Sequence, residues 1–374
     1  MRIRIAILLC CVLTLGCDSI FLGDESPIDV SANLELPPST GDGIEVSSPS
    51  REGLDSAMLF NMVKDYMDNG SPGIRSILIS RNNKLVLEAY FDGWNRERRQ
   101  DLRSASKSFV SAVAGIAIDK GVIASVDEKV LSYFPEYQQI ENHDARKYDM
   151  TIRDLLRMRT GLGCNDWSPA SPGNQEYMYP KDDWIKFIFD LPVVNTPGSI
   201  FSYCSGAPIV VSAIITKASG KKSSDFADEN LFAPLGITDY VWEYMPGKRE
   251  YAGGKLHMRP RDFLKFGLLM LNDGRWNDQV ILSEGWIQES TAPNGTVPVR
   301  RAGVEYGYYW WVTSWDIDGE IINAYYANGN GGQLLYIFEE LDMVVAFTGN
   351  AYNTNADNKV YSIIQRKILP AVLN

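Results

Sequence analysis

Apolar residues recur along the chain with two different periods, and each period predicts a different element. A helical spacing of three and four residues comes first, at Leu59, Met62, Val63 and Tyr66. Two runs rich in aliphatic residues follow at 76–80 and 85–91, joined by four polar residues. Runs of that kind around a short polar link predict a β-hairpin.

The extended pattern returns only near the other end of the chain. Strands are expected in four runs, at 306–314, 321–326, 333–338 and 343–348, before a closing helix over 359–368. The pattern between the two groups of strands is mostly helical. Helices are expected after a capping box at 151–154, over 208–219 and over 262–271.

This order of elements predicts an α+β fold. Strands at both ends of a chain with helices between them indicate one antiparallel sheet, built from both chain ends and flanked by helices. The segment over about 110–300 is expected to form an inserted, mostly helical lobe. An active site would then lie where the lobe meets the sheet.

The first residues have the composition of an export signal. Two arginines precede an apolar run over 5–15 that is too short to span a bilayer. The run ends in Thr14-Leu15-Gly16-Cys17, which resembles a bacterial lipobox. The resemblance implies a signal peptide over 1–16 and lipidation of Cys17. Thr14 departs from the usual aliphatic residue, so plain secretory cleavage stays open as the alternative.

An exported protein is therefore expected, anchored to a membrane by its lipid and facing the periplasm. Asp18 follows the cysteine, and in Gram-negative lipoproteins an aspartate there indicates retention at the inner membrane. Residues 17–53 are rich in Pro, Ser, Gly and Asp and lack apolar periodicity, which predicts a flexible tether. The folded domain is expected over 54–374.

Composition and charge narrow the classes of partner. The chain has 36 Lys and Arg against 47 Asp and Glu, a formal net charge of −11, and no basic stripe. Phosphate backbones are bound by clustered Lys and Arg, so no nucleic-acid partner is expected. The chain has only two histidines, His143 and His257, and neither Cys164 nor Cys204 has a second cysteine close to it in sequence, so no metal site and no cofactor are expected. The oligomeric state is left open.

Two cysteines remain in the mature chain, Cys164 and Cys204. Two thiols in an oxidising compartment can pair. Pairing requires their Cα atoms to approach closely, and the sequence does not show this separation. A disulfide and two buried free thiols therefore both stay open.

The segment Ser104-Ala105-Ser106-Lys107 spells the motif S-x-x-K. The motif alone is weak, and a second copy occurs at 219–222 beside a polar loop. Only the first copy leads into an apolar helical run, over 109–118. A serine at the mouth of a buried helix faces the positive end of the helix dipole, and a lysine three residues later lies on the same face.

An ordinary lysine, with a pKa of about 10.4, is uncharged in only about one molecule in a thousand near pH 7.4. A lysine that acts as a base therefore needs burial or neighbouring cations to lower its pKa. A buried helix provides such a setting. We predict Ser104 as nucleophile and Lys107 as its base; the alternative is a solvated lysine at a helix start.

With this motif the chain resembles a known superfamily. Residues 104–109 are similar to the nucleophile helix of class C β-lactamases, penicillin-binding proteins, and the related esterases and 6-aminohexanoate-dimer (nylon-oligomer) hydrolases. Further similar segments follow in the same order, at 150–162, 197–205, 231–237 and 258–262. The resemblance covers nearly everything from about residue 54 onward, and it implies a β-lactamase/transpeptidase-like fold.

The resemblance also implies a third catalytic group, Tyr203. A tyrosine at this place in the superfamily relays a proton between the serine hydroxyl and the leaving group. The usual pattern is Tyr-x-Asn, whereas this chain has Tyr203-Cys204-Ser205, and Ser205 offers only a shorter hydroxyl for substrate binding. Tyr326-Ala327-Asn328 spells the pattern literally but falls on an expected strand, so Tyr203 is favoured.

Members of the superfamily have a glycine-containing strand near the C-terminus. We place Asn330-Gly331-Gly332 in that position, to within a residue, because glycines let a strand backbone approach a substrate closely. The amide of Gln333 is then expected to pair with that of Ser104 as an oxyanion hole. The alternative is a glycine hairpin with no catalytic partner.

The same strand carries a lysine in β-lactamases, where it meets a substrate carboxylate, and Asn330 has no charge. Uncharged esters or amides are therefore the expected substrates. The resemblance implies a serine hydrolase that acts through an acyl-enzyme on a small ester, amide or short peptide. The alternatives are a D-amino-acid peptidase or weak β-lactamase, and a lipoprotein that binds penicillin or peptidoglycan fragments with little turnover. A Ser-His-Asp hydrolase is disfavoured, because no G-x-S-x-G elbow is present.

Overall fold

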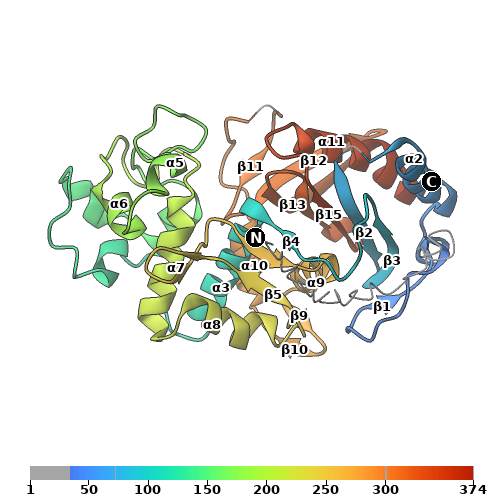
Figure 1. Ribbon diagram of the computed structural model, residues 1–374, viewed down its shortest axis with the longest axis horizontal. Coiled ribbons are helices and arrows are strands. Elements are labelled where there is room, and N and C mark those ends of the chain that lie inside the picture. The colour runs from blue at the N-terminus through green and yellow to red at the C-terminus, as the bar shows by residue number, and fades with distance from the viewer. Residues whose placement is uncertain (1–33, 72, 300, 374) are drawn as a thin grey trace, which may run out of the picture.

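The computed structural model describes residues 34–71, 73–299 and 301–373. An eight-stranded sheet lies beside a lobe of helices (Figure 1). In spatial order its strands are β1 (Glu45–Val46), β3 (Lys84–Tyr90), β2 (Ile74–Arg81), β15 (Met343–Gly349), β14 (Gln333–Phe338), β13 (Glu320–Gly329), β12 (Trp311–Ile317) and β11 (Glu305–Tyr306). Strands from both ends of the chain meet where β2 pairs with β15, which confirms the predicted fold class.

The sheet is antiparallel except at one edge, where β1 runs parallel to β3. Its central strands are almost completely buried because helices cover both faces. Gly267 of α9 (Pro260–Leu271) has no room for a Cβ beside Val344 and Leu335, so this helix packs tightly on one face. On the opposite side, Tyr361 of α11 (Ala356–Ile363) stacks on Trp315 of β12, with ring centroids 4.7 Å apart.

Helices from the start and the end of the folded domain pack against each other. Helix α2 (Ser56–Asn69) packs against the helical turns η7 (Ile364–Ile368) and α12 (Leu369–Leu373), so the C-terminus lies beside α2 (Figure 1). The chain also forms small two- and three-stranded sheets and short helices: β4 (Gln100–Asp101) with β8 (Leu256–Met258) and β5 (Tyr240–Trp242), β6 (Tyr244–Met245) with β7 (Arg249–Glu250), β9 (Arg275–Trp276) with β10 (Gln279–Val280), and α10 (Glu284–Thr291).

The aromatic run expected as one strand over 306–314 is two strands, β11 and β12, paired to each other. The turn between them contains Tyr309, whose φ of 62° is left-handed. The Tyr308 and Tyr309 backbone N–H groups donate to the carbonyls of Ser290 and Leu156. These contacts with distant segments bend the run, and an apolar pattern alone does not encode them.

The helical lobe is built around α7 (Gly206–Ser219), most of whose residues are buried. Around α7 are α4 (Ile152–Leu156), α5 (Gln175–Met178), α6 (Trp184–Asp190) and α8 (Ser223–Ala227). The expected capping box is present at the start of α4, between Thr151 and Asp154. The lobe is shorter than the predicted 110–300, because α9 falls within that range and packs on the sheet instead.

The flexible tether predicted over 17–53 is wrong for residues 34–53. Leu34 and Ile44 are buried in the core, and β1 extends the sheet. Arg261 of α9 donates hydrogen bonds to the carbonyl of Pro38 and to the side chain of Thr40. Isolated apolar contacts and one buried arginine hold this segment, and neither leaves a periodic pattern in the sequence. The predicted signal peptide, Cys17 and the rest of the tether lie outside the described residues.

Among the residues that the structure describes, no helix is both long and apolar enough to cross a membrane.

Candidate active site

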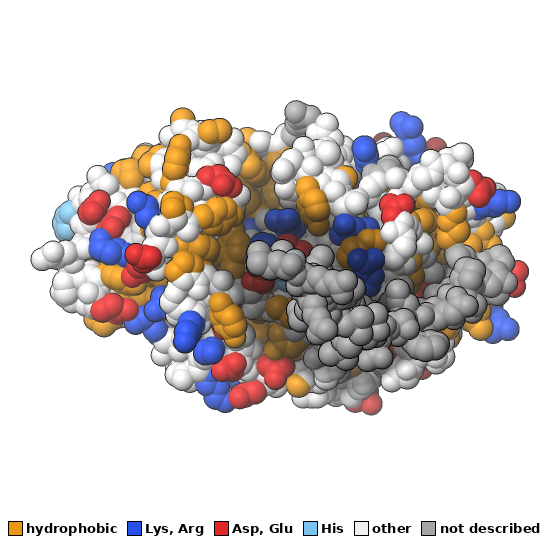
Figure 2. Space-filling view, viewed as in Figure 1, with side chains coloured by type: hydrophobic (Ala, Val, Ile, Leu, Met, Phe, Trp, Pro, Cys, Tyr) orange, Lys and Arg blue, Asp and Glu red, His pale blue; other side chains and the backbone are white. Residues whose placement is uncertain are grey.

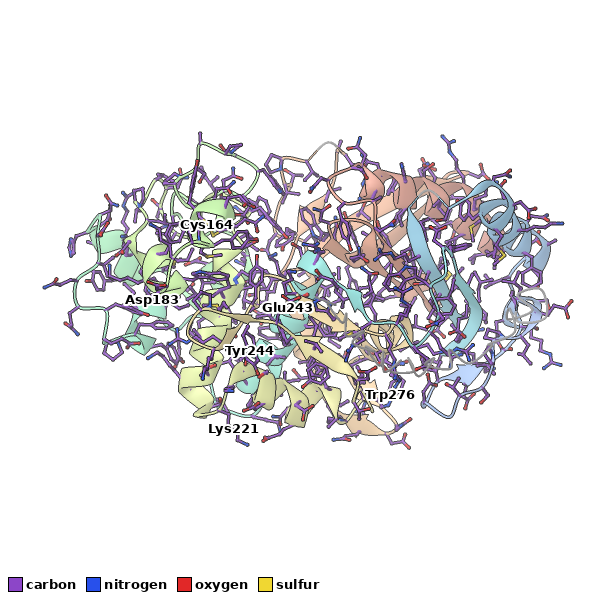
Figure 3. The ribbon with its side chains drawn as sticks, in the orientation of Figure 1. Cys164, Asp183, Lys221, Glu243, Tyr244 and Trp276 are labelled. Carbon is purple, nitrogen blue, oxygen red and sulfur yellow. A yellow bond between two sulfur atoms is a disulfide. The ribbon has the colours of Figure 1, made fainter. Side chains whose placement is uncertain are left out.

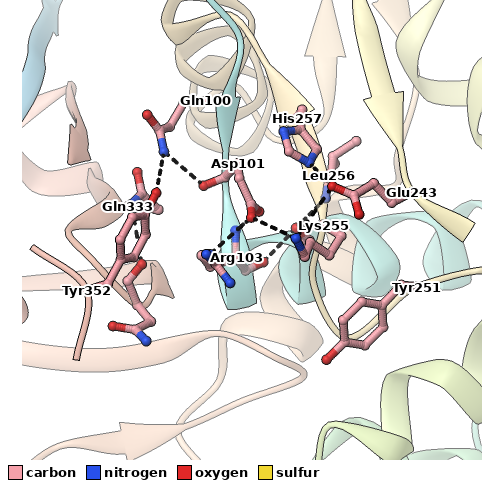
Figure 4. A network of polar contacts seen from close by, with 12 residues as sticks. Gln100, Asp101, Arg103, Glu243, Tyr251, Lys255, Leu256, His257, Gln333 and Tyr352 are labelled. Atoms are coloured by element: carbon pink, nitrogen blue, oxygen red, sulfur yellow. Dashed lines mark hydrogen bonds and ion pairs between the residues drawn. The ribbon is translucent and has the colours of Figure 1, made fainter. Parts of the chain in front are cut away.

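Ser104 lies in a tight turn, η2 (Arg103–Ala105), that leads into helix α3 (Ser106–Asp119). The residue before it, Arg103, has a left-handed φ of 52°. Asp101 holds this conformation: its carboxylate accepts from the Arg103 backbone N–H at 2.9 Å and pairs with Arg103 Nε at 3.0 Å (Figure 4). Strained backbone of this kind persists where neighbours over-determine it, and it is common at active sites.

Lys107 is fully buried on the first turn of α3, and its Nζ donates to Ser104 Oγ at 2.9 Å. The Gly253 carbonyl accepts a second hydrogen bond from Nζ at 2.5 Å. Burial lowers the pKa of Lys107 to about 7, against the opposing charge of Asp166. Near neutral pH, about half of the Lys107 amines are therefore uncharged.

Tyr203, in the segment before α7, is the third residue beside Ser104 and Lys107. Lys107 Nζ lies 5.2 Å from the centroid of its ring, and its phenol is hydrogen-bonded to the Ser104 side chain. Burial raises the pKa of Tyr203 well above its ordinary value, although the hydrogen bond to Ser104 acts in the opposite direction. The phenol thus stays protonated at neutral pH, and the three groups expected to form the site lie together.

Cys164 and Cys204 are joined by a disulfide, which settles the question that the sequence left open. Cys164 lies in the helical lobe (Figure 3), and Cys204 directly follows Tyr203. Ser202 Oγ donates to the Cys164 carbonyl at 2.6 Å beside this bond. The disulfide therefore attaches the segment of Tyr203 to a loop far away in sequence.

Asp166 in the same loop was not singled out from the sequence. Its carboxylate accepts from the backbone N–H groups of Ser205 at 2.7 Å and Gln175 at 2.9 Å. Burial raises the pKa of Asp166, while the Ser205 hydrogen bonds and the charge of Lys107 lower it. An aspartate in a loop without periodicity carries no sequence signal that separates it from the many others in this acidic chain.

Ser205, expected to bind substrate, instead faces Asp166. It is buried, its side chain is hydrogen-bonded to the Asp166 carboxylate, and it does not line a cavity at Ser104. The adjoining Gly253 has no room for a side chain, because a Cβ there would lie 2.9 Å from the Ser205 carbonyl oxygen. Ser205 therefore belongs to the packing around Lys107 rather than to the substrate surface.

The glycine that approaches the Ser104 turn is Gly329, at the end of β13. A Cβ at Gly329 would collide with the Leu102 carbonyl oxygen and lie 3.1 Å from the Ala105 nitrogen. The expected glycines, Gly331 and Gly332, instead face the ring of Tyr352 and the methyl group of Ala356. The predicted position of the strand was therefore too far along the chain.

Gln333, whose backbone amide was expected in the oxyanion hole, does not line the cavity at Ser104. Its side-chain amide is fully buried and bonds both backbone groups of Gly349, at 2.8 and 2.9 Å. Across the sheet Gln333 pairs with Gly329.

Beyond Tyr326, β13 has no pairing with β12, so the cleft-side edge of β13 is open next to Ser104. Asn330 follows Gly329 directly and lines the cavity that Ser104 enters.

This cavity, the Ser104 cavity, has a volume of about 520 Å³. Its lining residues are Ser104, Trp167, Tyr203, Pro298, Val299, Arg301, Val304, Trp311, Tyr326, Asn328, Asn330, Thr354, Asn355 and Asn358. Trp167 stacks on Tyr203 with ring centroids 5.2 Å apart. The surface is hollowed between the lobe and the sheet, with hydrophobic side chains beside the hollow (Figure 2).

A second cavity, of about 490 Å³, shares Asn330 with the first. Arg103, Glu243, Tyr251 and Lys255 are among its lining residues. Glu243 joins Lys255 to His257, with a 2.7 Å contact to the histidine (Figure 4). The cleft at Ser104 thus has two arms, one mostly aromatic and amide-lined, the other lined by charges of both signs.

The chain is similar in sequence or in fold to several known hydrolases. The chain is 22% identical over 269 residues to a 6-aminohexanoate-dimer hydrolase of Paenarthrobacter ureafaciens, and the match spans 64% of each protein. A D-stereospecific amidohydrolase from Streptomyces sp. has a similar structure, with a TM-score of 0.64, 16% identity, and coverage of 82% of this chain and 98% of the other. A family VIII carboxylesterase matches with a TM-score of 0.66, 16% identity, and coverage of 84% and 96%.

At this level of sequence identity, the two structural matches show a similar fold and no more. The family model named Beta-lactamase matches residues 59–368, which include all three groups that converge at Ser104. The chain therefore belongs to the Beta-lactamase family.

Proposed function

We propose that the protein is a serine hydrolase that cleaves a carboxylic ester or amide through an acyl-enzyme. The uncharged amine of Lys107 takes the proton of Ser104 Oγ, and the oxygen attacks the substrate carbonyl carbon. The phenol of Tyr203 donates its proton to the departing alcohol or amine and recovers one from the Lys107 ammonium. Water then gives a proton to Lys107 and attacks the acyl carbon, and this proton passes from Lys107 to Ser104 Oγ as the carboxylic acid is released.

The developing oxyanion needs two preorganised donors. We assign them to the backbone N–H groups of Ser104 and Asn330. The close approach of Gly329 to the turn of Ser104 supports this choice, because it brings the next residue of the strand to the same cavity. An N–H in the first turn of a helix has no partner within the helix, so that of Ser104 is free for a ligand.

One observation carries the proposal: a buried amine with a pKa of about 7 lies 2.9 Å from Ser104 Oγ. Among the described residues, Lys107 Nζ has no carboxylate at ion-pair distance, and its hydrogen bonds go to the Ser104 hydroxyl and the Gly253 carbonyl. Burial of an amine that no carboxylate contacts directly costs stability, and strongly lowered lysine pKa values of this kind cluster at functional sites. The names of the relatives, an oligomer hydrolase, an amidohydrolase and a carboxylesterase, support ester or amide chemistry.

A fluorophosphonate probe and a substrate panel test the proposal together. The panel contains short-chain p-nitrophenyl esters, linear amides, D-Ala-D-Ala peptides and nitrocefin. We expect labelling and turnover in the wild type, and neither in Ser104→Ala or Lys107→Ala. Ser219→Ala, in the other S-x-x-K copy, is the matched control and should keep both.

The outcomes separate the candidate functions. Labelling of Ser104 without turnover of any substrate would favour a binding protein that is acylated and not released. Absence of both in the wild type would refute the hydrolase.

We further propose that the protein is an exported lipoprotein anchored through Cys17, as the lipobox-like segment indicates. Metabolic labelling with a radioactive fatty acid should mark the wild type and fail for Cys17→Ser. Cys11→Ser, in the apolar run, is the matched control and should stay labelled. An unlabelled wild type, released in soluble form, would instead support plain secretory cleavage.

A further inference from the structure

The Ser104 cavity contains a single charged side chain among the described residues that line it, Arg301. The other lining groups are aromatic rings, aliphatic side chains, amides and hydroxyls. The chain as a whole carries a net charge of −11, so this cation is not part of a generally basic surface. Arg301 thus places a positive charge in the cavity of a protein whose net charge is negative.

Aromatic groups hold Arg301 in place. Its Nη2 donates to the Tyr326 hydroxyl at 2.8 Å, and its guanidinium lies 3.9 Å from the centroid of the Tyr361 ring. Within the described side chains, no carboxylate lies at ion-pair distance from Arg301, and its buried Nε has no acceptor. One of its five N–H donors is used in this way, which leaves others for a ligand.

Two other partly buried arginines of this chain are neutralised by carboxylates, whereas Arg157 and Arg159, like Arg301, have no carboxylate at ion-pair distance among the described side chains. Arg261 pairs with Glu88 at 2.6 Å, and Arg153 pairs with Asp127 at 2.8 Å. Arg301 is half-buried and lines a cavity, so an anion that enters this cavity can pair with it without competition from a protein carboxylate at ion-pair distance. Arginine is also the side chain best suited to carboxylates, because its planar fork can bond both oxygens.

The position of Tyr203 indicates which part of the substrate Arg301 meets. Tyr203 lines the Ser104 cavity and not the second cavity. In the proposed function, on which this step rests, the phenol of Tyr203 protonates the leaving group. The leaving group must therefore lie in the cavity that Arg301 also enters.

We propose that Arg301 binds a carboxylate on the leaving-group side of the substrate, so that the released alcohol or amine carries a negative charge. The substrate class is then an ester of a hydroxy acid or an amide of an amino acid, with a neutral acyl part. This differs from the sequence-based expectation of uncharged substrates. The strand at Gly329 carries no cation, but a loop before β11 places one at the same cavity.

Two esters that differ only in the leaving group test the proposal: 3-carboxyphenyl butyrate and 3-carbamoylphenyl butyrate. Carboxylate and carboxamide have nearly the same shape, and the rates with hydroxide correct for intrinsic reactivity. We expect the wild type to prefer the carboxylate by about tenfold in kcat/KM, the size of one hydrogen bond to a charged group. The preference should weaken as salt is added.

Variants test whether the Arg301 side chain causes the preference for the carboxylate ester. Arg301→Gln should bring the ratio of the two kcat/KM values close to one, and Arg301→Lys should keep part of the preference. Arg366→Gln removes the same charge at an exposed position of η7, away from the cleft, and should leave the ratio as in the wild type. If Arg301→Gln fails to fold, inhibition of the wild type by 3-hydroxybenzoate against 3-hydroxybenzamide gives the same comparison without a variant.

The outcomes distinguish this inference from the proposed function. Equal kcat/KM for the two esters in the wild type, or a preference that survives in Arg301→Gln, overturns the carboxylate subsite and leaves the hydrolase intact. If the wild type hydrolyses neither ester and Ser104 does not react with the fluorophosphonate, the hydrolase itself is refuted and the subsite with it.

Discussion

Asp166 and Tyr203 are joined through their backbones: the N–H of Asp166 donates to the Tyr203 carbonyl at 2.9 Å. The Asp166 carboxylate then accepts the N–H of Ser205, two residues after the tyrosine. The disulfide between Cys164 and Cys204 flanks these contacts. The phenol beside Ser104 is thus positioned by a loop of the helical lobe, and this arrangement gives the first prediction.

The disulfide should stabilise both the fold and the position of Tyr203. Closing a loop between cysteines 40 residues apart is expected to contribute about 4 kcal/mol to the free energy of unfolding. Guanidinium denaturation of the wild type, with and without reductant, measures this contribution. Cys164→Ser/Cys204→Ser should match the reduced wild type and should not respond to reductant. Equal stability and equal kcat in the oxidised and reduced forms would show that the disulfide has neither role.

Ester hydrolysis should depend on pH through Lys107. The mechanism needs the uncharged amine, and burial lowers its pKa to about 7. We therefore expect kcat/KM to fall about tenfold for each pH unit below 7 and to level off above it. The raised pKa of Tyr203 keeps its phenol protonated, so no decline should follow up to pH 10. A limb centred near 10, the ordinary range of a lysine, would contradict the assigned base.

Asp166→Asn should move that acidic limb to lower pH. The Asp166 charge raises the pKa of Lys107, so removing it lets the pKa fall further. Asparagine has one acceptor oxygen for two backbone N–H groups, which should cost about 1–3 kcal/mol of stability. Asp183→Asn is the matched control, since Asp183 also accepts two backbone N–H groups, at the start of α6 (Figure 3). Both N–H groups at Asp183 bond Oδ1, which asparagine keeps as a carbonyl oxygen, so this variant should leave both the stability and the limb close to those of the wild type.

Tyr203→Phe should slow substrates according to how much their leaving group needs a proton. An ethyl ester releases a strongly basic alkoxide, whereas p-nitrophenolate leaves without protonation. We expect the ethyl ester to lose at least about a hundredfold more in kcat than the p-nitrophenyl ester, the lower range for a general acid. Tyr326→Phe removes the other cavity tyrosine and should show no such dependence. Equal losses for the two esters in Tyr203→Phe would remove the tyrosine from the proton path.

Gly329→Ala should abolish acylation of Ser104. The added methyl group has no room against the Leu102 carbonyl, so the strand must withdraw and carry the Asn330 N–H with it. Gly332→Ala is the control: its φ of 94° makes alanine strained, but its surroundings leave space. That variant should lose stability and still react with the fluorophosphonate. Normal labelling of Gly329→Ala would show that the strand at Gly329 does not form the oxyanion site.

The sequence alone was enough for features that depend on local periodicity. Residues three apart share one face of a helix, so the S-x-x-K spacing already brings Lys107 Nζ to Ser104 Oγ. The runs at both ends of the chain likewise became one sheet, because their alternation and length suit buried strands. Tyr203 was reached through the resemblance to the superfamily, and the structure places it beside the other two groups.

Only the tertiary structure decided the features that depend on contacts between distant segments. The residues concerned lie in loops or at strand ends. They are the disulfide partners Cys164 and Cys204, the buried Asp166, Gly329 beside the Ser104 turn, and Arg301 at the cavity. Such positions have no repeating pattern, since each is set by one neighbour from elsewhere in the chain. Local periodicity fixes which residues share a face, whereas packing between elements fixes which faces meet, and the surroundings of Ser104 depend on the second.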